Sequence, residues 1–365
     1  FEPKLDAIKT LKNTRYYPHI LGLLGTAYVQ LLRFDEAESI LDEAMSVAEA
    51  RNDVEAIADA SIGLMGMHCV RWRPGSSQQV KALADRILAT DLNDNLYYRT
   101  YCRFFVTWAA AIRGDFDLSL AQGRETAAMG RRENYPGAVG FGLTAVAYNE
   151  TFLENYDAAI ATAAEGSRLS GGYVDKLICD GIKGLAMALS GDGKGGYETL
   201  RRIRNELEEK QYLSMFNIVD MPMGVAMALM GDLSDGTKWI EESAERYMAS
   251  GNAHGGGMAY NALGEVYLQM ATSKEKPTLS VVRKNLMFLI RTVPFAKSKA
   301  LKCFDTAAEI GLKGNMYGLA AMALLNKASV LKASGKPKPA QDALDQARDV
   351  MQNIQWQAMS AKIDR

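Results

Sequence analysis

The sequence predicts an all-α protein in which about eight helix pairs stack into a right-handed superhelical solenoid. The first observation is an internal repeat, because residues 184–192 (GLAMALSGD) read almost the same as residues 224–232 (GVAMALMGD). Such self-similarity is typical of stacked supersecondary units. The second observation is the shared Gly-Asp ending, since glycine closes a helix in a left-handed turn. Together they indicate helix-turn-helix repeats.

A pattern of small and large residues extends the repeat along most of the chain. Residues 24–44 begin with Leu-Gly-x-x-Tyr and continue into an alanine-rich second helix, and the same signature recurs at residues 263–267. The pattern is that of the tetratricopeptide repeat (TPR), with glycine where two helices cross closely. Turn positions lie 40 residues apart at 114 and 154 and again at 191 and 231. Each helix should therefore be about one turn longer than in the standard 34-residue repeat.

Four segments follow in chain order. Residues 1–14 are expected to be a remnant helix of an upstream repeat, because the chain opens in mid-helix without a starter methionine. This opening leads us to expect an excised fragment. Residues 15–270 should form TPR-like repeats, and residues 271–294 should be a helical insertion that interrupts the penultimate pair. Residues 295–365 should complete the C-terminal repeats and a cap.

The insertion is predicted to be an amphipathic helix between two prolines. Its apolar residues recur at three-to-four spacing, at Leu279, Val282, Leu286 and Ile290. Leaving such a stripe in water would cost about 1.5–3 kcal/mol per side chain, so we expect it to pack against the solenoid beside the last two repeats.

The other face of the insertion should be basic. It carries Arg283, Lys284 and Arg291, within a stretch of eight positive residues and one acidic residue between positions 274 and 302. A solvated helix face is one interpretation of this pattern. The other is a docking face for an acidic neighbouring domain of the same polypeptide.

Composition and charge exclude several classes of function. The net charge of −1 supplies no global field for nucleic acid, and no apolar run approaches the roughly 18 residues of a membrane span. We therefore expect a cytoplasmic protein with neither a nucleic-acid nor a membrane partner. The four cysteines lack C-x-x-C spacing and fall within predicted helices, which favours free buried thiols over a disulfide framework or zinc site.

No motif predicts catalysis. Gly191-x-Gly193-x-x-Gly196 formally matches a dinucleotide fingerprint, but a helix rather than a strand precedes it. Lys194 is followed by glycine where a phosphate-binding loop has Ser or Thr. The three histidines are too dispersed for a metal cluster or a Ser-His relay. We expect no catalytic residue, no metal and no cofactor, and hence no enzyme activity.

The concave wall of the solenoid is the candidate binding site. TPR arrays line this wall with the first helix of each pair, and the repeat frame directs an aromatic set toward it, namely Tyr101, Phe104, Trp108, Phe141 and Tyr148. An exposed apolar wall of this kind marks an interaction site. The alternative is that a tightly wound superhelix buries these rings in its own core. A second expectation is a basic rim for a carboxylate or phosphate, formed by Arg103 together with Arg71, Arg73, Arg99 and Arg113; ordinary solvated helix faces are the alternative.

The C-terminal part resembles a known family. Its order of motifs is LGEVYL at 263–268, KEKP at 274–277, FLIRT at 288–292, PFA at 294–296 and AAEIG at 307–311. Over about residues 255–347 this order resembles the C-terminal TPR region of bacterial class III adenylate/guanylate cyclase-like multidomain proteins. In that family a cyclase domain and a P-loop ATPase module precede the TPR tail. The resemblance implies a non-catalytic regulatory or scaffold segment, and it transfers no catalytic residue to this chain.

Two hypotheses for function follow. The first is a segment of a cyclase-type signalling protein that contacts a protein partner or neighbouring domains of the same polypeptide. The second is the small-ligand-sensing TPR domain of an ATP-dependent transcription activator, with the ligand in the concave groove. The insertion favours the first hypothesis, and the neighbouring domains of the full-length polypeptide would discriminate between them.

Overall fold

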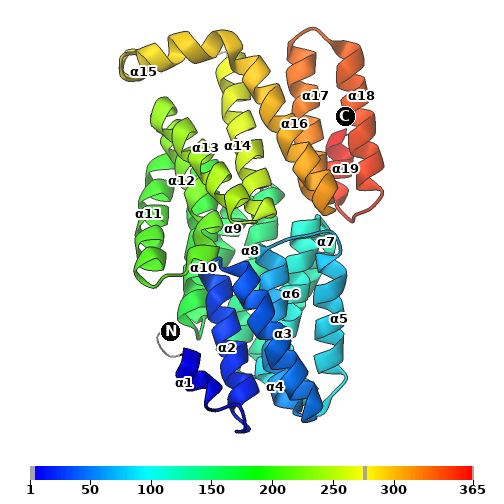
Figure 1. Cartoon of the computed structure of the whole chain (residues 1–365). Helices are drawn as coiled ribbons and strands as arrows, with labels where there is room; N and C mark the ends of the chain where they lie inside the picture. The colour runs from blue at the N-terminus through cyan, green and yellow to red at the C-terminus, as the bar shows by residue number, and fades with distance from the viewer. Residues whose placement is uncertain (1–4, 274–277, 364–365) are drawn as a thin grey trace.

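The computed structural model describes residues 5–273 and 278–363, and every regular element within them is a helix. Eight consecutive helix pairs make up most of this described chain (Figure 1): α2 (Tyr17–Gln30) with α3 (Phe34–Ala50), α4 (Val54–Val70) with α5 (Ser76–Leu88), α6 (Leu96–Arg113) with α7 (Phe116–Arg132), α8 (Pro136–Phe152) with α9 (Tyr156–Leu169), α10 (Tyr173–Leu189) with α11 (Gly193–Glu209), α12 (Asp220–Leu229) with α13 (Leu233–Ala249), α14 (Ala253–Thr272) with α16 (Ala296–Gly314), and α17 (Tyr317–Ala333) with α18 (Pro337–Met351). The inserted helix α15 (Leu279–Thr292) lies between α14 and α16, and α19 (Gln357–Ile363) follows the last pair. The predicted all-α solenoid with one insertion in the penultimate pair is confirmed.

The N-terminal segment is less helical than expected. Helix α1 spans only Leu5–Lys9, residues 10–16 form turns, and residues 1–4 of the expected remnant helix lie outside the described residues. The hydroxyls of Thr10 and Thr14 donate to the backbone carbonyls of Ala7 and Leu11. These side-chain bonds compete with helical hydrogen bonding, which favours turns over a continuous helix.

In four of the pairs, the close crossing of the two helices is made by a glycine against a large apolar side chain. A β-carbon on Gly25, Gly184 or Gly224 would meet Leu41, Leu200 or Ile240, respectively, at 2.5–2.8 Å. In each case the glycine and its large partner are 16 residues apart in the sequence, which explains the repeat seen there. Gly264 instead packs on Phe304, 40 residues later. The insertion therefore adds 24 residues without changing the crossing.

Contacts across about 240 residues close the superhelix on itself. Trp72, at the end of α4, donates its indole N–H to the Gly314 carbonyl at 2.8 Å. The carboxylates of Asp115 and Asp117 accept the backbone N–H groups of Gln355 and Gln357 at 3.0 and 2.9 Å. One hydrophobic cluster joins α4–α7 to α16–α19. The C-terminal repeats thus lie against the second and third pairs (Figure 1).

A second closing contact joins the first pair to the sixth. The short 3-10 helix η3 (Leu213–Ile218), which precedes α12, packs beside α2. There the Ser214 hydroxyl donates to the Gln30 side-chain carbonyl at 2.5 Å. Because the first helices of the pairs face the inside of this closed turn, they enclose the interior from several sides.

The tightest point of the closure supplies a stability test. Gly114 has φ of +107°, and a β-carbon there would lie 2.3 Å from the backbone nitrogen of Gly318. Gly191 has φ of +105° in the equivalent turn of another pair, with nothing within 4 Å. We expect Gly191→Ala to cost about 1–2 kcal/mol from left-handed strain alone. Gly114→Ala should cost about 1–3 kcal/mol more, because it also forces two backbones apart. Urea unfolding of both variants measures the difference, and equal losses would mean that the Gly114–Gly318 contact is dispensable.

Candidate functional site

Two neighbouring first helices supply a continuous line of aromatic rings. In α6, Tyr101, Phe104 and Trp108 recur at helical spacing and therefore share one face. Phe141 of α8 lies with its ring centroid 4.3 Å from that of Phe104, and Tyr148 lies 4.9 Å from Trp108. The structure thus brings together the five aromatic residues that the sequence assigned to the concave wall.

Four of these rings border a cavity of about 250 Å³, which we call the central cavity, and they are those of Tyr101, Phe104, Trp108 and Phe141. It is lined by α2, α4, α6, α8 and α10, together with η3 and the start of α14. Tyr101, Phe104 and Trp108 are only partly buried, whereas Phe141 is buried. The wall therefore faces a cavity instead of forming a closed core. No Asp, Glu, Lys or Arg occurs among the described residues that line it.

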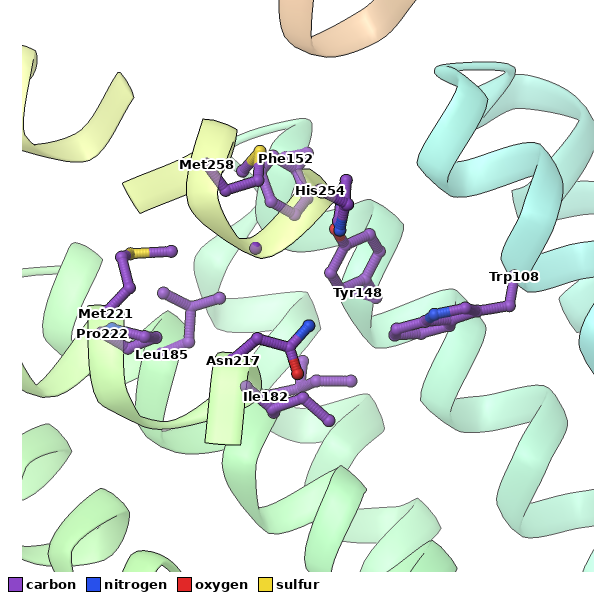
Figure 2. A pocket seen from close by; sticks show the side chains of 12 residues that line it. Trp108, Tyr148, Phe152, Ile182, Leu185, Asn217, Met221, Pro222, His254 and Met258 are labelled. Atoms are coloured by element: carbon purple, nitrogen blue, oxygen red, sulfur yellow. The ribbon is translucent and has the colours of Figure 1, made fainter. Parts of the chain in front are cut away.

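A smaller chamber of about 40 Å³ (Figure 2) adjoins the central cavity. The two share Trp108, Asn217, Ile218 and His254 as lining residues. Figure 2 shows Trp108 reaching in from α6 and Asn217 from the opposite side, and His254 of α14 and Tyr148 also line this chamber. His254 is only 8% exposed. Neither its ring nitrogens nor the Asn217 amide has a hydrogen-bond partner among the described residues. Two polar groups therefore remain available where the chambers meet.

The local sequence explains how His254 and Asn217 come together. Asn252 caps α14 by accepting the Gly255 N–H at 2.9 Å, which places His254 in the first turn of the helix. A β-carbon on Gly255 would lie 3.2 Å from Cβ of Asn217, so glycine permits η3 to approach α14 closely. Burial lowers the pKa of His254 to about 4. Its imidazole is therefore neutral at pH 7.

Sequence reasoning missed both of these polar residues. The three histidines appeared unconnected, and Asn217 lies outside the repeat pattern. The available signal was the run of three glycines at residues 255–257 directly after His254, inside a predicted helix. Glycine costs about 1 kcal/mol in a helix interior, so three in succession indicate a close approach of another segment.

The expected basic rim is wrong, because each of its arginines faces a carboxylate and none lines the central cavity. Arg103 points toward α7, where it pairs with Glu125 at 3.2 Å. The other four arginines pair in the same way: Arg71 with Asp35 and Glu38, Arg73 with Glu38, Arg99 with Glu133, and Arg113 with Asp115. These arginines balance the acidic residues of adjacent helices and offer no unneutralised cluster to an anionic ligand.

The apolar stripe of the insertion is not packed against the solenoid as expected. Leu279, Leu286 and Ile290 are 83%, 49% and 59% exposed, and only Val282 of the stripe is partly buried. The opposite side of α15 makes the attachment. There Asn285 donates to the Gly231 carbonyl at 2.7 Å and accepts the Ser234 N–H at 3.0 Å. Phe288, on the same side of α15 as Asn285, packs against the hydrophobic cluster of α12, α13, α14 and α16. These contacts together leave the apolar stripe facing outward.

The three predicted docking residues of α15 differ in their surroundings. Lys284 pairs with Asp232 and so belongs to the attachment. Arg283 and Arg291 are exposed, and no described residue pairs with them. The face available to a partner is therefore mixed, with two arginines beside an exposed apolar stripe. Lys274 and Lys276 of the basic stretch lie outside the described residues.

The cysteines and the potential metal ligands provide no further candidate site among the described residues. All four cysteines are free and buried, and burial raises the pKa of Cys102, Cys179 and Cys303 to about 12, which disfavours the reactive thiolate. In the described part of the chain, no three His, Cys, Asp or Glu side chains are grouped so that they could hold a metal ion. Within the same ranges no helix has the length and apolarity that a membrane crossing requires.

Comparison with known proteins supports the fold. No protein-family model matches the sequence, and no curated protein matches it. Among solved structures, the chain is similar to a Rap protein complexed with competence and sporulation factor, with a TM-score of 0.50 and 10% sequence identity. The likeness covers 92% of this chain and 98% of that one. At such low identity it shows the shared architecture of helical repeats and nothing finer.

The anchor of α15 leads to a prediction about local stability. Replacing Asn285 with Ala removes its two hydrogen bonds to the turn before α13, each worth about 0.5–1.5 kcal/mol. Amide hydrogen exchange over residues 279–291 should therefore accelerate by about 5- to 150-fold, while the global melting temperature stays nearly unchanged. Arg283→Ala, on the exposed face, is the control and should leave exchange as it is. Unchanged exchange in Asn285→Ala would show that other contacts hold the helix.

Burial of His254 predicts a pH dependence of stability. Its pKa is about 4 when folded and 6.5 when unfolded, so the unfolded chain binds the proton first as the pH falls. The difference in free energy of unfolding between the unchanged protein and His254→Asn should therefore be constant above pH 6.5. As the pH falls toward 4, the unchanged protein should lose about 3 kcal/mol relative to the variant. Burial raises the pKa of Asp175 to about 6, so protonation of Asp175 has the opposite effect on stability as the pH falls. This effect is the same in the unchanged protein and in the variant, and it cancels in the comparison. Urea unfolding across this range tests the difference, and parallel curves would contradict a buried neutral histidine.

Proposed function

We propose that this chain is a non-catalytic sensor segment that binds an apolar ligand in its central cavity and communicates with a protein partner through its outer surface. The observation that carries the proposal is the central cavity itself, about 250 Å³ in volume and lined by aromatic side chains. Ligand pockets are typically concave and apolar with a few polar groups, as this cavity is. The aromatic residues Tyr101, Phe104, Trp108 and Phe141 provide its contact surface, and Tyr148 lines the adjoining chamber.

The position of the cavity explains how binding would be transmitted. A ligand in it would contact α2, α6, α10 and α14 together, although these helices belong to four different repeats. Each repeat of a solenoid otherwise contacts mainly its neighbours. A ligand that binds the closed superhelix better than an opened one would shift the population toward closure. The outward-facing surfaces of the repeats would move with it.

The outer surface carries a candidate partner site on α15. Exposed Arg283 and Arg291 lie beside the exposed apolar residues Leu286 and Ile290. Apolar contacts with basic neighbours suit an acidic domain that also offers an apolar surface. The similar Rap protein was solved in complex with competence and sporulation factor, which supports a binding role for solenoids of this architecture.

Within this role, the resemblance of residues 255–347 to cyclase-associated TPR regions favours a cytoplasmic, cyclase-type signalling protein. The volume of the central cavity equally suits the second hypothesis, a transcription activator whose TPR domain binds a small inducer. Both hypotheses need ligand sensing without catalysis. Sequencing the gene around this segment would separate them, since a cyclase domain supports the first and a helix-turn-helix domain the second.

The cavity makes a prediction that a neutral dye can test. N-phenyl-1-naphthylamine is uncharged and gains fluorescence in apolar sites, so we expect it to bind the purified chain saturably. Gly66 lines the central cavity, and a β-carbon there would make only ordinary contacts with Phe105 at 3.5 and 3.6 Å. Gly66→Leu should fill the cavity and weaken dye binding at least tenfold without unfolding the chain. Gly66→Ala is the matched control and should bind nearly as well as the unchanged protein.

The exposed stripe of α15 is the other apolar site that could capture the dye. A Leu286→Ser, Ile290→Ser double variant removes that stripe without touching the cavity. Binding that survives Gly66→Leu but disappears in the α15 variant would overturn the central cavity as the ligand site.

A further inference from the structure

The charge and polarity of the central cavity narrow the class of ligand. Resting on the function proposed above, we propose that the cavity selects an uncharged ligand with a compact ring body and one hydroxyl or amide group, which His254 and Asn217 hold by hydrogen bonds. The observation behind this is a site with two unpartnered polar side chains at one place and no charged residue in its described lining.

The absence of lining charges disfavours ionic ligands. The arginines around the wall are occupied by carboxylates outside the cavity, as Arg103 is by Glu125. A carboxylate or ammonium group that entered would lose its hydration and meet no counter-charge. Moving an ion from water into such surroundings costs several kcal/mol even after relaxation. An anionic ligand should therefore bind far more weakly than a neutral one of the same shape.

The polar end of the site is where the two chambers meet, and Figure 2 shows His254 and Asn217 in the smaller chamber. His254 and Asn217 line both chambers and have no partner among the described residues. A neutral imidazole offers one donor and one acceptor, and an amide side chain offers both kinds of group. A hydroxyl or amide on the ligand, which both donates and accepts, can satisfy the two together. Because His254 is only 8% exposed, a hydrogen bond to the ligand there would be shielded from water, so this pairing should favour binding.

The apolar part of the site suits a flat ring. Phe104 and Trp108 are stacked, with centroids 6.0 Å apart and an interplanar angle of 24°, and Phe141 closes on Phe104 at 4.3 Å. Aromatic surfaces of this kind favour stacked or edge contacts with another ring. The volume of about 250 Å³ lies just below the roughly 300–1,000 Å³ of pockets for drug-sized molecules. One or two fused rings would match it.

Three probes of similar shape test the proposal. 2-Naphthol carries a neutral hydroxyl, 2-naphthoate a charged carboxylate, and 2-methylnaphthalene no hydrogen-bonding group. Isothermal titration calorimetry or tryptophan fluorescence at pH 7 should show 2-naphthol binding at least tenfold more tightly than 2-naphthoate. His254→Leu should weaken 2-naphthol about fivefold or more and leave 2-methylnaphthalene within twofold. Asn217→Leu should act in the same direction, and it replaces His254→Leu should that variant fail to fold.

The outcomes separate this inference from the proposed function. Equal binding of 2-naphthol and 2-naphthoate would overturn the selection for neutral ligands, even if N-phenyl-1-naphthylamine still bound and Gly66→Leu still blocked it. Unchanged 2-naphthol affinity in both folded polar variants would overturn the roles of His254 and Asn217. Loss of all dye and probe binding would overturn the proposed function together with the inference.

Discussion

The contact between the second and third repeats and the C-terminal repeats is the constraint on which the rest of the structure depends. Trp72 reaches the Gly314 carbonyl, and the turn at Gly114 meets Gly318 with too little space for a β-carbon on either. Without this contact, the packing of η3 beside α2 would be left to join distant repeats, and the helix pairs would be freer to open. With it, first helices from distant repeats face one another across a closed interior. A shared hydrophobic cluster over α4–α7 and α16–α19 stabilises the closed form.

Side chains fill the closed interior incompletely, and the cavity that remains has a largely apolar lining without charged residues among those described. Protein interiors normally pack to the density of organic crystals, so a cavity of about 250 Å³ forgoes many favourable contacts. His254, which is only 8% exposed, adds a polar ring that has no hydrogen-bond partner among the described residues. Local features that lower stability without structural compensation are expected at functional sites. The same features that weaken the fold here are those that a neutral ring with one polar group would satisfy.

The insertion shows how attachment through another side of the helix can override an amphipathic pattern. Its three-to-four spacing predicts burial of the apolar stripe, but α15 is held by the hydrogen bonds of Asn285 to the turn at Gly231 and by the packing of Phe288 against the core. Asn285 has φ of −114° and ψ of 16°, so the helix is kinked at the anchor. The stripe is consequently presented outward, next to Arg283 and Arg291. Apolar periodicity predicted the helix correctly but not the direction in which its apolar face points.

The sequence by itself determined the helices, their pairing and the place of the insertion. These features rest on local relations, such as a glycine packing against a large residue 16 positions later, as Gly184 does against Leu200, and three of the pairs repeat this relation. The sequence also identified the aromatic wall, since Tyr101, Phe104 and Trp108 share one helical face. Only the tertiary structure decided whether that wall was core or cavity, and only it placed His254 beside Asn217. Both outcomes depend on superhelical curvature, which accumulates from small rotations between successive repeats and has no local signature in the sequence.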